Sequence, residues 1–463
     1  MSNKDRNGRN QSGNTTGTDN HKGSTQSKWV SHRKRATKLA GMTVSIMGKY
    51  ASHRVKSSFQ KSHNAEKSKN ELYAEIGKQV VATLGELKGA AMKVGQMLSQ
   101  MQHLFPKEFV EELTALQNQA PSMDYSVIER QIILELGDYP DNLFAAFDKK
   151  PMASASIGQV HKATTHDGQE VVMKIQYPGV EKACKSDLKH LRRLLRLGGL
   201  LKVDPSALES VFEELSETLI RELDYEQEAQ HLEAFRTFHS QDQGIIIPEV
   251  VKKFSSRAIL TTTLEQGDSI KEVAKSYPQE TKNYIGERLF TFVNRQVFEF
   301  NRFHSDPHPG NFAFRKDGSV IVYDFGSITP ISADQKLGFY QFMQASVDRN
   351  YPALDKSLQL LKVRSNASSD IPDSFYALWS DILMPPFDTD ELFDFGQSRI
   401  HKRAIKEWKT VLPYWKDFQP SPDTVFINRV IGGVYLMLVE MGSQCHFKTP
   451  LESLLEKNAP ETV

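Results

Sequence analysis

The spacing of apolar residues divides the chain into a helical first part, a strand-rich middle and a mainly helical last part. Between residues 71 and 101, apolar side chains recur every three or four positions, from Leu72 and Ile76 to Val94 and Leu98. This is the period of an amphipathic helix. Two further helices are predicted near residues 109–119 and 126–136. Residues 157–163 and 170–175 have the composition of strands joined by a turn.

The later pattern alternates between the two kinds of element. Helices are predicted over 185–197 and 206–238, followed by a strand pair at 245–251 and 258–263. A helix over 279–303 leads to two short strands at 312–314 and 320–323, and the residues beyond Pro330 are mainly helical. This order of elements predicts an α+β fold.

One polar segment stands out between the helix that ends at 303 and the short strands. It runs from His304 to Asn311 as H-S-D-P-H-P-G-N, and Asp324-Phe325-Gly326 follows. An Asp, an Asn five residues later and a D-F-G beyond them match the catalytic and metal-binding positions of protein-kinase-like enzymes. Asp306 would orient a hydroxyl or water, and Asn311 and Asp324 would supply hard oxygen ligands to Mg²⁺.

The upstream strands contain the other parts of a nucleotide site. Val171-Val172-Met173-Lys174 has the V-A-I-K form, which places Lys174 on the α/β-phosphates. Residues 153–160 align with the glycine-rich loop G-x-G-x-x-G-x-V, but alanine occupies the first two glycine positions, so the loop should be stiffer. The chain near Leu264 and Glu265 would meet the adenine. The predicted nucleotide-binding residues are therefore Ala153, Ala155, Ser156, Gly158, Val160, Lys174, Leu264 and Glu265.

Two glutamates six positions apart, Glu222 and Glu228, lie in the helix predicted over 206–238. On one continuous helix they would project about 120° apart and could serve different lysines. Lys174 is one candidate partner and Lys93 is the other. The alternative is a surface helix with ordinary charge pairs.

These motifs together resemble the UbiB/AarF family of atypical kinase-like proteins over about residues 70–330. The resemblance rests on Lys93-Val94-Gly95-Gln96, a K-x-G-Q motif, with the alanine-rich loop and the segments Arg221–Glu228, His304–Asn311 and Asp324–Gly326. It implies a two-lobed protein-kinase-like fold with an added helical extension that covers the active site and blocks peptides. It further implies that Lys93 and Gln96 face the nucleotide, that Glu222 pairs with Lys93, and that Glu228 pairs with Lys174.

The resemblance also predicts a division of the chain into four segments. These are a basic arm at 1–70, a helical K-x-G-Q extension at 71–125, a small lobe at 126–265, and a large lobe with a helical C-terminal region at 266–463. Three departures from the family pattern are evident. The loop reads Ala-Ser-Ala-Ser where Ala-Ala-Ala-Ser is common, no A-P-E motif or long activation segment follows Gly326, and the transmembrane segment of several members is not seen.

Charge and cysteine content bear on location and partners. Residues 1–70 hold 15 Lys or Arg and 3 Asp or Glu, an excess of 12 positive charges, so the rest must carry −11 to give the chain total of +1. Residues 28–62 mix basic and apolar side chains, which fits a helix lying on an anionic membrane or a helix docked on the body. Only two cysteines occur, which favours a reducing cytoplasmic setting with at most peripheral membrane contact.

The leading prediction is an atypical kinase-like ATPase that binds ATP (or ADP) and Mg²⁺. By resemblance it would support ubiquinone and isoprenoid lipid metabolism, with a prenylated lipid or quinone precursor and ubiquinone-biosynthesis enzymes as partners and no nucleic acid. Two alternatives remain open. One is a small-molecule phosphotransferase, which shares H-x-D-x-x-x-x-N but has no K-x-G-Q helix. The other is a nucleotide-gated scaffold that does not hydrolyse ATP.

Overall fold

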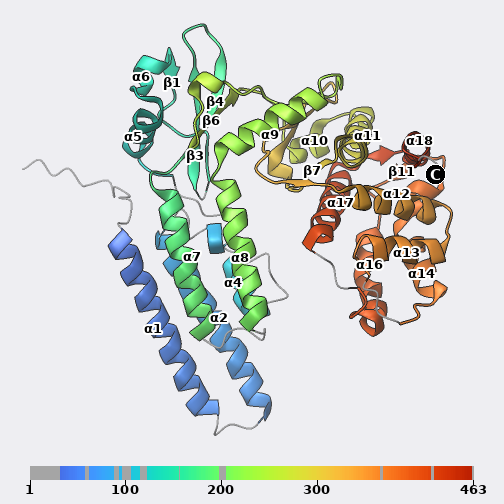
Figure 1. Ribbon diagram of the computed structural model, residues 1–463, viewed down its shortest axis with the longest axis horizontal. Coiled ribbons are helices and arrows are strands. Elements are labelled where there is room, and N and C mark those ends of the chain that lie inside the picture. Colours follow the sequence, from blue (N-terminus) through green and yellow to red (C-terminus); the bar gives the residue numbers. More distant parts are fainter. Residues whose placement is uncertain are drawn as a thin grey trace, which may run out of the picture.

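Three parts make up the molecule: a bundle of long helices, a small lobe built on an antiparallel sheet, and a larger, mainly helical lobe (Figure 1). The computed structural model describes residues 32–57, 62–87, 93–95, 106–114, 122–155, 157–197, 205–364, 369–418 and 422–460. The mixture of helices and small sheets is the predicted α+β fold in two kinase-like lobes. Within this described part, no helix is long and apolar enough to cross a membrane.

The bundle joins the N-terminal helices to helices that follow the first strands. It consists of α1 (His32–Ser57), α2 (Ser62–Leu87), α4 (Lys107–Thr114), α7 (Val180–Leu197) and α8 (Pro205–Glu222) (Figure 1). Helix α1 buries Leu39, Met42 and Ile46 in the shared core, and its buried Arg35 pairs with Asp187 of α7. Residues 32–57 therefore form a helix that is docked on the body through Leu39, Met42 and Ile46.

The small lobe contains the predicted strand–turn–strand unit. Its sheet has the order β1-β3-β4-β6, with β2 added to β3, and every pairing is antiparallel. The elements are α5 (Tyr125–Leu136), α6 (Pro140–Leu143), β1 (Ala146–Phe147), β2 (Ala153–Ser154), β3 (Gly158–Thr164), β4 (Glu170–Gln176) and β6 (Ile259–Thr263). The register places Val160 opposite Lys174, so the alanine-rich hairpin and the strand lysine are neighbours.

Two sequence expectations in this region are wrong. The helix predicted over 206–238 is two helices, α8 and α9 (Tyr225–Phe238), because Asp224 caps α9 by accepting a hydrogen bond from the Gln227 amide. Residues 245–251 do not pair as a strand with 258–263 beyond an isolated bridge between Val250 and Thr262. Strand β5 (Ile245–Ile246) instead runs parallel to β9 of the large lobe and extends that small sheet.

The large lobe begins with helices that lead into the polar motif. After α10 (Ile270–Ser276) and α11 (Gln279–Arg295), a π-helical turn (Gln296–Phe300) precedes the short strands β7 (Arg302–His304), β8 (Phe312–Phe314), β9 (Val320–Val322) and β10 (Ile328–Pro330). The hairpin β8–β9 forms as predicted. Strand β10 pairs with β7, which brings the segment after Gly326 back beside the start of the motif.

The remaining residues form the predicted mainly helical C-terminal region, which lies on the side of the large lobe away from the small lobe (Figure 1). Helix α17 crosses the lobe and adds Met437, Leu438 and Met441 to its core. The elements are α12 (Ala333–Val347), α13 (Tyr351–Leu360), α14 (Asp373–Leu383), α15 (Pro385–Asp388), β11 (Phe393–Asp394), α16 (Ile400–Glu407), a 3₁₀ segment (Trp408–Tyr414), α17 (Pro422–Met441), β12 (Gln444–Cys445) and α18 (Lys448–Lys457).

Candidate nucleotide site

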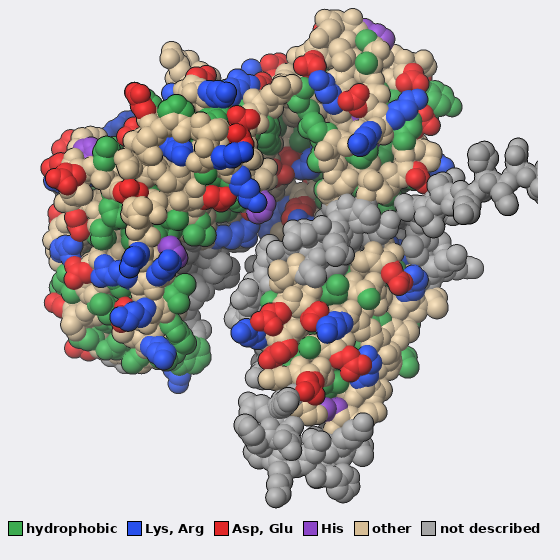
Figure 2. All heavy atoms as spheres, turned by 180° about the vertical axis from the view of Figure 1, so that it is seen from behind, with side chains coloured by type: hydrophobic (Ala, Val, Ile, Leu, Met, Phe, Trp, Pro, Cys, Tyr) green, Lys and Arg blue, Asp and Glu red, His purple; other side chains and the backbone are tan. Residues whose placement is uncertain are grey.

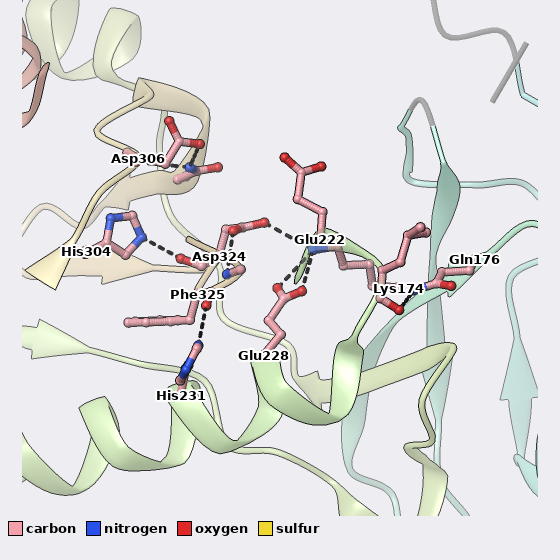
Figure 3. Close-up of polar contacts among 12 residues, drawn as sticks. Lys174, Gln176, Glu222, Glu228, His231, His304, Asp306, Asp324 and Phe325 are labelled. Atoms are coloured by element: carbon pink, nitrogen blue, oxygen red, sulfur yellow. Dashed lines mark hydrogen bonds and ion pairs between the residues drawn. The ribbon is translucent and has the colours of Figure 1, made fainter. Parts of the chain in front are cut away.

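Lys174 is the centre of a charged cluster that joins three elements (Figure 3). Its Nζ lies 2.9 Å from both carboxylate oxygens of Glu228 on α9 and 3.1 Å from Oδ2 of Asp324. The ring of Tyr225 lies 4.9 Å from the same nitrogen, in cation–π range. The side chain of Glu228 is only 3% exposed, so α9, strand β4 and the D-F-G segment are tied together at a buried point.

The three charges change one another's affinity for protons. Burial alone would lower the pKa of Lys174, but the carboxylates of Asp324 and Glu228 raise it well above its usual range. Burial raises the pKa of Glu228 to about 7, against the opposing effect of Lys174. Burial also acts to raise the pKa of Asp324, but Lys174 and the Gly326 amide together lower it to about 2. Of the two carboxyl groups, Asp324 is therefore ionised at neutral pH, whereas Glu228 gains or loses its proton near pH 7.

The polar motif holds its own side chains in place. The ring Nε2 of His304 donates to the carbonyl of Asp324, which fixes the D-F-G segment against β7 (Figure 3). Asn311 donates through Nδ2 to Oδ2 of Asp306 at 2.8 Å and to its carbonyl at 3.2 Å. This leaves Oδ1 of Asn311 as an acceptor. Oδ1 of Asp306 accepts a hydrogen bond from Arg429 of α17 at 3.0 Å.

A Mg²⁺ ion fits the donor set that Asn311 and Asp324 provide. An amide oxygen and a carboxylate are hard ligands, and Mg²⁺ in nucleotide sites uses one or two protein oxygens with phosphates and water. No group of three or more His, Cys, Asp or Glu side chains that could hold a metal by itself occurs among the residues with described positions. The two residues would thus hold the ion together with the nucleotide.

The second Lys–Glu pair connects the N-terminal extension to this cluster. Lys93 Nζ lies 2.6 Å from Oε2 of Glu222, at the end of α8. Glu222 is close enough to Glu228 to contribute to the rise in the pKa of that carboxyl. The two glutamates serve different lysines because a helix break separates them, and not because of their angle on one helix. Gln96 lies outside the described residues.

The alanine-rich loop is a tight hairpin above Lys174. Ala153 on β2 pairs with Val160 on β3, and the Ala155 amide donates to the Gly158 carbonyl at 2.9 Å. A Cβ on Gly158 would lie 2.3 Å from the carbonyl oxygen of Ile175, so this position requires glycine. Neither alanine has a positive φ, which is why the hairpin forms without glycine at these two positions. Ser156 lies outside the described residues.

The predicted adenine-facing residues follow the end of β6. The Leu264 amide donates to the Glu170 carbonyl at 3.0 Å, and the Glu265 carbonyl accepts from the Tyr323 hydroxyl at 2.9 Å. The Glu265 carboxylate is paired with Arg315 at 2.6 Å. The Leu264 carbonyl and the Glu265 amide form no hydrogen bond with another described residue, so these two groups are the ones that could meet a base.

The structure places three residues at the site that the sequence did not single out. Tyr225 stacks on Lys174, His231 donates from Nδ1 to the carbonyl of Phe325 at 3.2 Å, and Arg429 reaches Asp306. Tyr225 and His231 flank Glu228 at one helical turn, a spacing that could have identified them. Nothing in the sequence points to Arg429, which lies 123 residues after Asp306.

Known proteins share this architecture and sequence. Residues 115–358, more than half of the chain, match the model of the ABC1 atypical kinase-like domain. The chain is 31% identical over 377 residues to the atypical kinase COQ8, mitochondrial, of Saccharomyces cerevisiae, covering 80% of this chain and 74% of that protein.

Two further comparisons cover most of the chain. Identity is 28% over 433 residues to the probable serine/threonine-protein kinase abkA of Dictyostelium discoideum, covering 88% and 75% of the two chains. The solved complex of Rv3197 with erythromycin, from Mycobacterium tuberculosis, superimposes with a TM-score of 0.61 at 27% identity, covering 85% of this chain and 98% of that one. The chain therefore belongs to the ABC1 family of atypical kinase-like proteins, the UbiB/COQ8 family that its motifs resemble.

Proposed function

We propose that this protein is a Mg²⁺-dependent ATPase that acts on or beside a lipid substrate and does not phosphorylate proteins. The observation that carries the proposal is the ion pair between Lys93 and Glu222, which fastens the helical extension next to the Lys174–Glu228–Asp324 cluster. Figure 2 shows a hollow where the three parts of the molecule meet. An extension fixed at this point takes space that a peptide substrate would need, while a nucleotide and water remain small enough to enter.

The residues have separate tasks in this proposal. Lys174 would hold the α/β-phosphates, and Asn311 and Asp324 would hold Mg²⁺, which would neutralise charge on the transferring phosphoryl group. Asp306 would orient a water molecule by accepting its hydrogen bond. Asn311 already holds the Asp306 carboxylate in a fixed orientation at 2.8 Å, and such preorganisation lowers the cost of reaching the transition state.

The lipid part of the proposal rests on the resemblance to the UbiB family. That family is linked to ubiquinone biosynthesis, so a prenylated lipid or quinone precursor, or an enzyme of that pathway, is the expected partner. ATP hydrolysis would drive a conformational step on this partner. The COQ8 relative of Saccharomyces cerevisiae is named as mitochondrial, and the cysteine content of this chain fits a reducing compartment.

ATP turnover measured with and without a quinone-like lipid tests the proposal. We expect wild-type protein to release phosphate at a rate that rises with the lipid, and Asp324→Asn to lose this activity because an amide binds Mg²⁺ more weakly. The chain contains another D-F-G tripeptide, Asp394-Phe395-Gly396, which begins at the last residue of β11. Asp394→Asn is the matched control and should behave as wild type. Equal turnover in Asp324→Asn and wild type would remove the metal role.

Two other activities give different results in the same assay. A small-molecule phosphotransferase would consume ATP only with an acceptor alcohol and would yield a phosphorylated product in place of free phosphate. A nucleotide-gated scaffold would bind Mg²⁺–ATP tightly and release no product under any lipid. The K-x-G-Q extension supports the ATPase over both, because it adds a component at the nucleotide that neither alternative needs.

A further inference from the structure

Helix α17 of the C-terminal region packs directly against the segment from His304 to Asn311, which we call the catalytic loop. A Cβ on Gly433 would lie 2.5 and 2.6 Å from the ring carbons of Pro307, so only glycine lets the helix come this close. On the same helix, Val430 and Met437 are buried in the core of the large lobe. Close approach at Gly433 and buried anchors on either side of it fix the position of α17 relative to residues 306–311.

Arg429 lies one helical turn before Gly433 and extends toward Asp306. Its Nη2 is 3.0 Å from Asp306 Oδ1, and the other carboxylate oxygen accepts from Asn311. The side chains of Arg429 and Asp306 are 42% and 35% exposed, so the pair faces the open side of the site. A guanidinium has five N–H donors, so one contact to Asp306 leaves the others available for phosphate oxygens.

The segment from His304 to Asn311 has no Lys or Arg to bind a phosphoryl group. Its exposed His308 uses Nδ1 to accept a hydrogen bond from the Gly310 amide. Lys174 is already shared by two carboxylates. Phosphoryl transfer places negative charge on three equatorial oxygens and depends on cations beside them. Of the described cationic side chains, Arg429 is the one hydrogen-bonded to Asp306.

We propose that Arg429 binds the γ-phosphoryl group of ATP, so that helix α17 of the C-terminal region supplies an arginine to the active site in cis. The inference rests on the proposed ATP hydrolysis. Water oxygen bonds to the γ-phosphorus, the bond to the β–γ bridging oxygen breaks, and ADP leaves with that electron pair. Asp306 accepts the water proton, and the products are ADP, phosphate and one proton. Arg429 stabilises the charge on the γ-oxygens while it holds Asp306 toward the water.

Binding of two nucleotides that differ at the γ-position tests Arg429 without turnover. We expect Arg429→Gln to keep ADP affinity within about twofold and to bind a non-hydrolysable ATP analogue at least tenfold more weakly, as loss of a charged hydrogen bond predicts. Where wild type hydrolyses ATP, kcat should fall by roughly 10²- to 10³-fold, as for a lost transition-state donor. Arg429→Lys should restore part of both effects. Arg288→Gln on α11, whose side chain donates to the Asp317 carbonyl, is the matched control.

The outcomes separate the residue's role from the proposed activity. Equal loss of ADP and analogue affinity in Arg429→Gln would overturn the γ-phosphate contact and leave Arg429 as a structural residue. Faster turnover in the variant would also overturn it, because the ion pair with Arg429 would then inhibit Asp306. Selective loss of analogue affinity in a protein that never hydrolyses ATP would support the contact while the ATPase proposal fails.

A separate observation concerns the surface of α16 and the 3₁₀ segment that follows it. Ile405, Trp408, Leu412 and Trp415 are 69%, 51%, 48% and 55% exposed, at spacings of three and four residues. Residues 399–418 contain six Lys or Arg and two acidic residues. In Figure 2, basic and apolar side chains lie side by side at the lower end of the large lobe. Exposed apolar clusters of this kind mark interaction surfaces.

We infer that this basic–aromatic surface docks on an anionic lipid bilayer. Tryptophan is enriched at the level of lipid headgroups, and lysines beside it are attracted to anionic lipids, so the two side-chain types fit one partner. Helix α1 buries Leu39, Met42 and Ile46 in the bundle and exposes Val44 and Met47, so its described surface lacks the exposed tryptophans of α16 and the 3₁₀ segment. The large lobe would then face the bilayer with α16.

Sedimentation with vesicles tests this surface. We expect full-length protein to bind phosphatidylserine-containing vesicles and not pure phosphatidylcholine, with Trp408→Ser/Trp415→Ser lowering binding at least tenfold. Leu134→Ser/Tyr139→Ser, which removes exposed apolar side chains elsewhere, is the control and should bind as wild type. Unchanged binding of the tryptophan variant would overturn the inference. So would a wild-type dimer that the tryptophan variant converts to monomer, because the surface would then pair two copies.

Discussion

Two lysine–glutamate pairs lie in the same site, and they differ in their surroundings more than in their geometry. Lys93 and Glu222 are 2.6 Å apart with about a quarter of each side chain exposed, whereas Lys174 and Glu228 are 2.9 Å apart with Glu228 nearly inaccessible. Burial raises the pKa of Glu228 to about 7, and against the effect of burial the carboxylates of Asp324 and Glu228 raise the pKa of Lys174 well above its usual range. The pair with the shorter distance, Lys93–Glu222, thus has the weaker electrostatic interaction. The burial of Glu228 and the additional charge of Asp324 strengthen the interaction at Lys174.

The largest effect should follow from breaking the buried pair at Lys174. Lys174→Met leaves Glu228 and Asp324 facing each other without a cation, and an uncompensated buried charge costs about 3–5 kcal/mol. We expect nucleotide affinity and any ATP turnover to fall by roughly 10- to 10²-fold, because the phosphates would lose a charged hydrogen bond worth about 1.5–3 kcal/mol and about 1.4 kcal/mol is a factor of ten. Titration with a fluorescent ATP analogue measures the change.

Lys162→Met is the control for this experiment. Lys162 lies on the neighbouring strand β3 and pairs across the strands with Glu170, with 33% and 51% of the two side chains exposed. We expect it to change nucleotide affinity less than twofold, because exposed pairs contribute only about 0–1 kcal/mol. Similar losses of affinity in both variants would mean that removing any positive charge from this sheet weakens nucleotide binding. Lys174 would then have no specific role in binding the phosphates.

A smaller effect should come from protonating Glu228. Its raised pKa of about 7 means that the folded protein gains a proton there more readily than the unfolded chain. Its protonation therefore stabilises the fold at low pH, and this contribution is lost as the pH rises through about 7. Activity should instead fall at low pH. Once Glu228 is neutral, Lys174 pairs with Asp324 alone, and Lys174 then competes with Mg²⁺ for the Asp324 carboxylate.

We therefore expect kcat/KM for ATP to decline tenfold per unit as the pH falls below about 7. Glu228→Gln should lose this limb and give a low, flat profile between pH 5 and 8. Asp324, whose pKa is lowered to about 2, remains ionised throughout this range and does not contribute. A limb that persists unchanged in Glu228→Gln would show that another group titrates.

The sequence predicted most of this site because its motifs are local. His304–Asn311, the D-F-G tripeptide and the strand lysine lie in short motifs, so the pattern of residues was enough to place them on their elements. The side chain of Lys174, however, is held by Glu228 and Asp324 from distant parts of the chain. The helix break at Asp224 was missed because a capping side chain overrode a continuous apolar pattern. The contact of Arg429 with Asp306 depends on how α17 packs across the lobe at Gly433, and no local pattern records such packing.

The smallest effect should follow from removing the exposed pair at Lys93. A partly exposed pair is worth about 1 kcal/mol at most, which would lower the melting temperature by only about 1 °C in a chain of this size. We expect Lys93→Met to keep ADP affinity within about threefold, in contrast to Lys174→Met. Differential scanning fluorimetry and nucleotide titration measure the two quantities.

A double-mutant cycle with Glu222→Gln decides whether Lys93 acts through that carboxylate. If the pair is the whole contribution of Lys93, the double variant should lose no more stability than Lys93→Met alone, giving a coupling energy near 1 kcal/mol. Additive losses would mean that Lys93 has another partner in the site. The comparison would then change, because two lysines would serve the nucleotide and the helical extension would be part of the catalytic machinery, not only its cover.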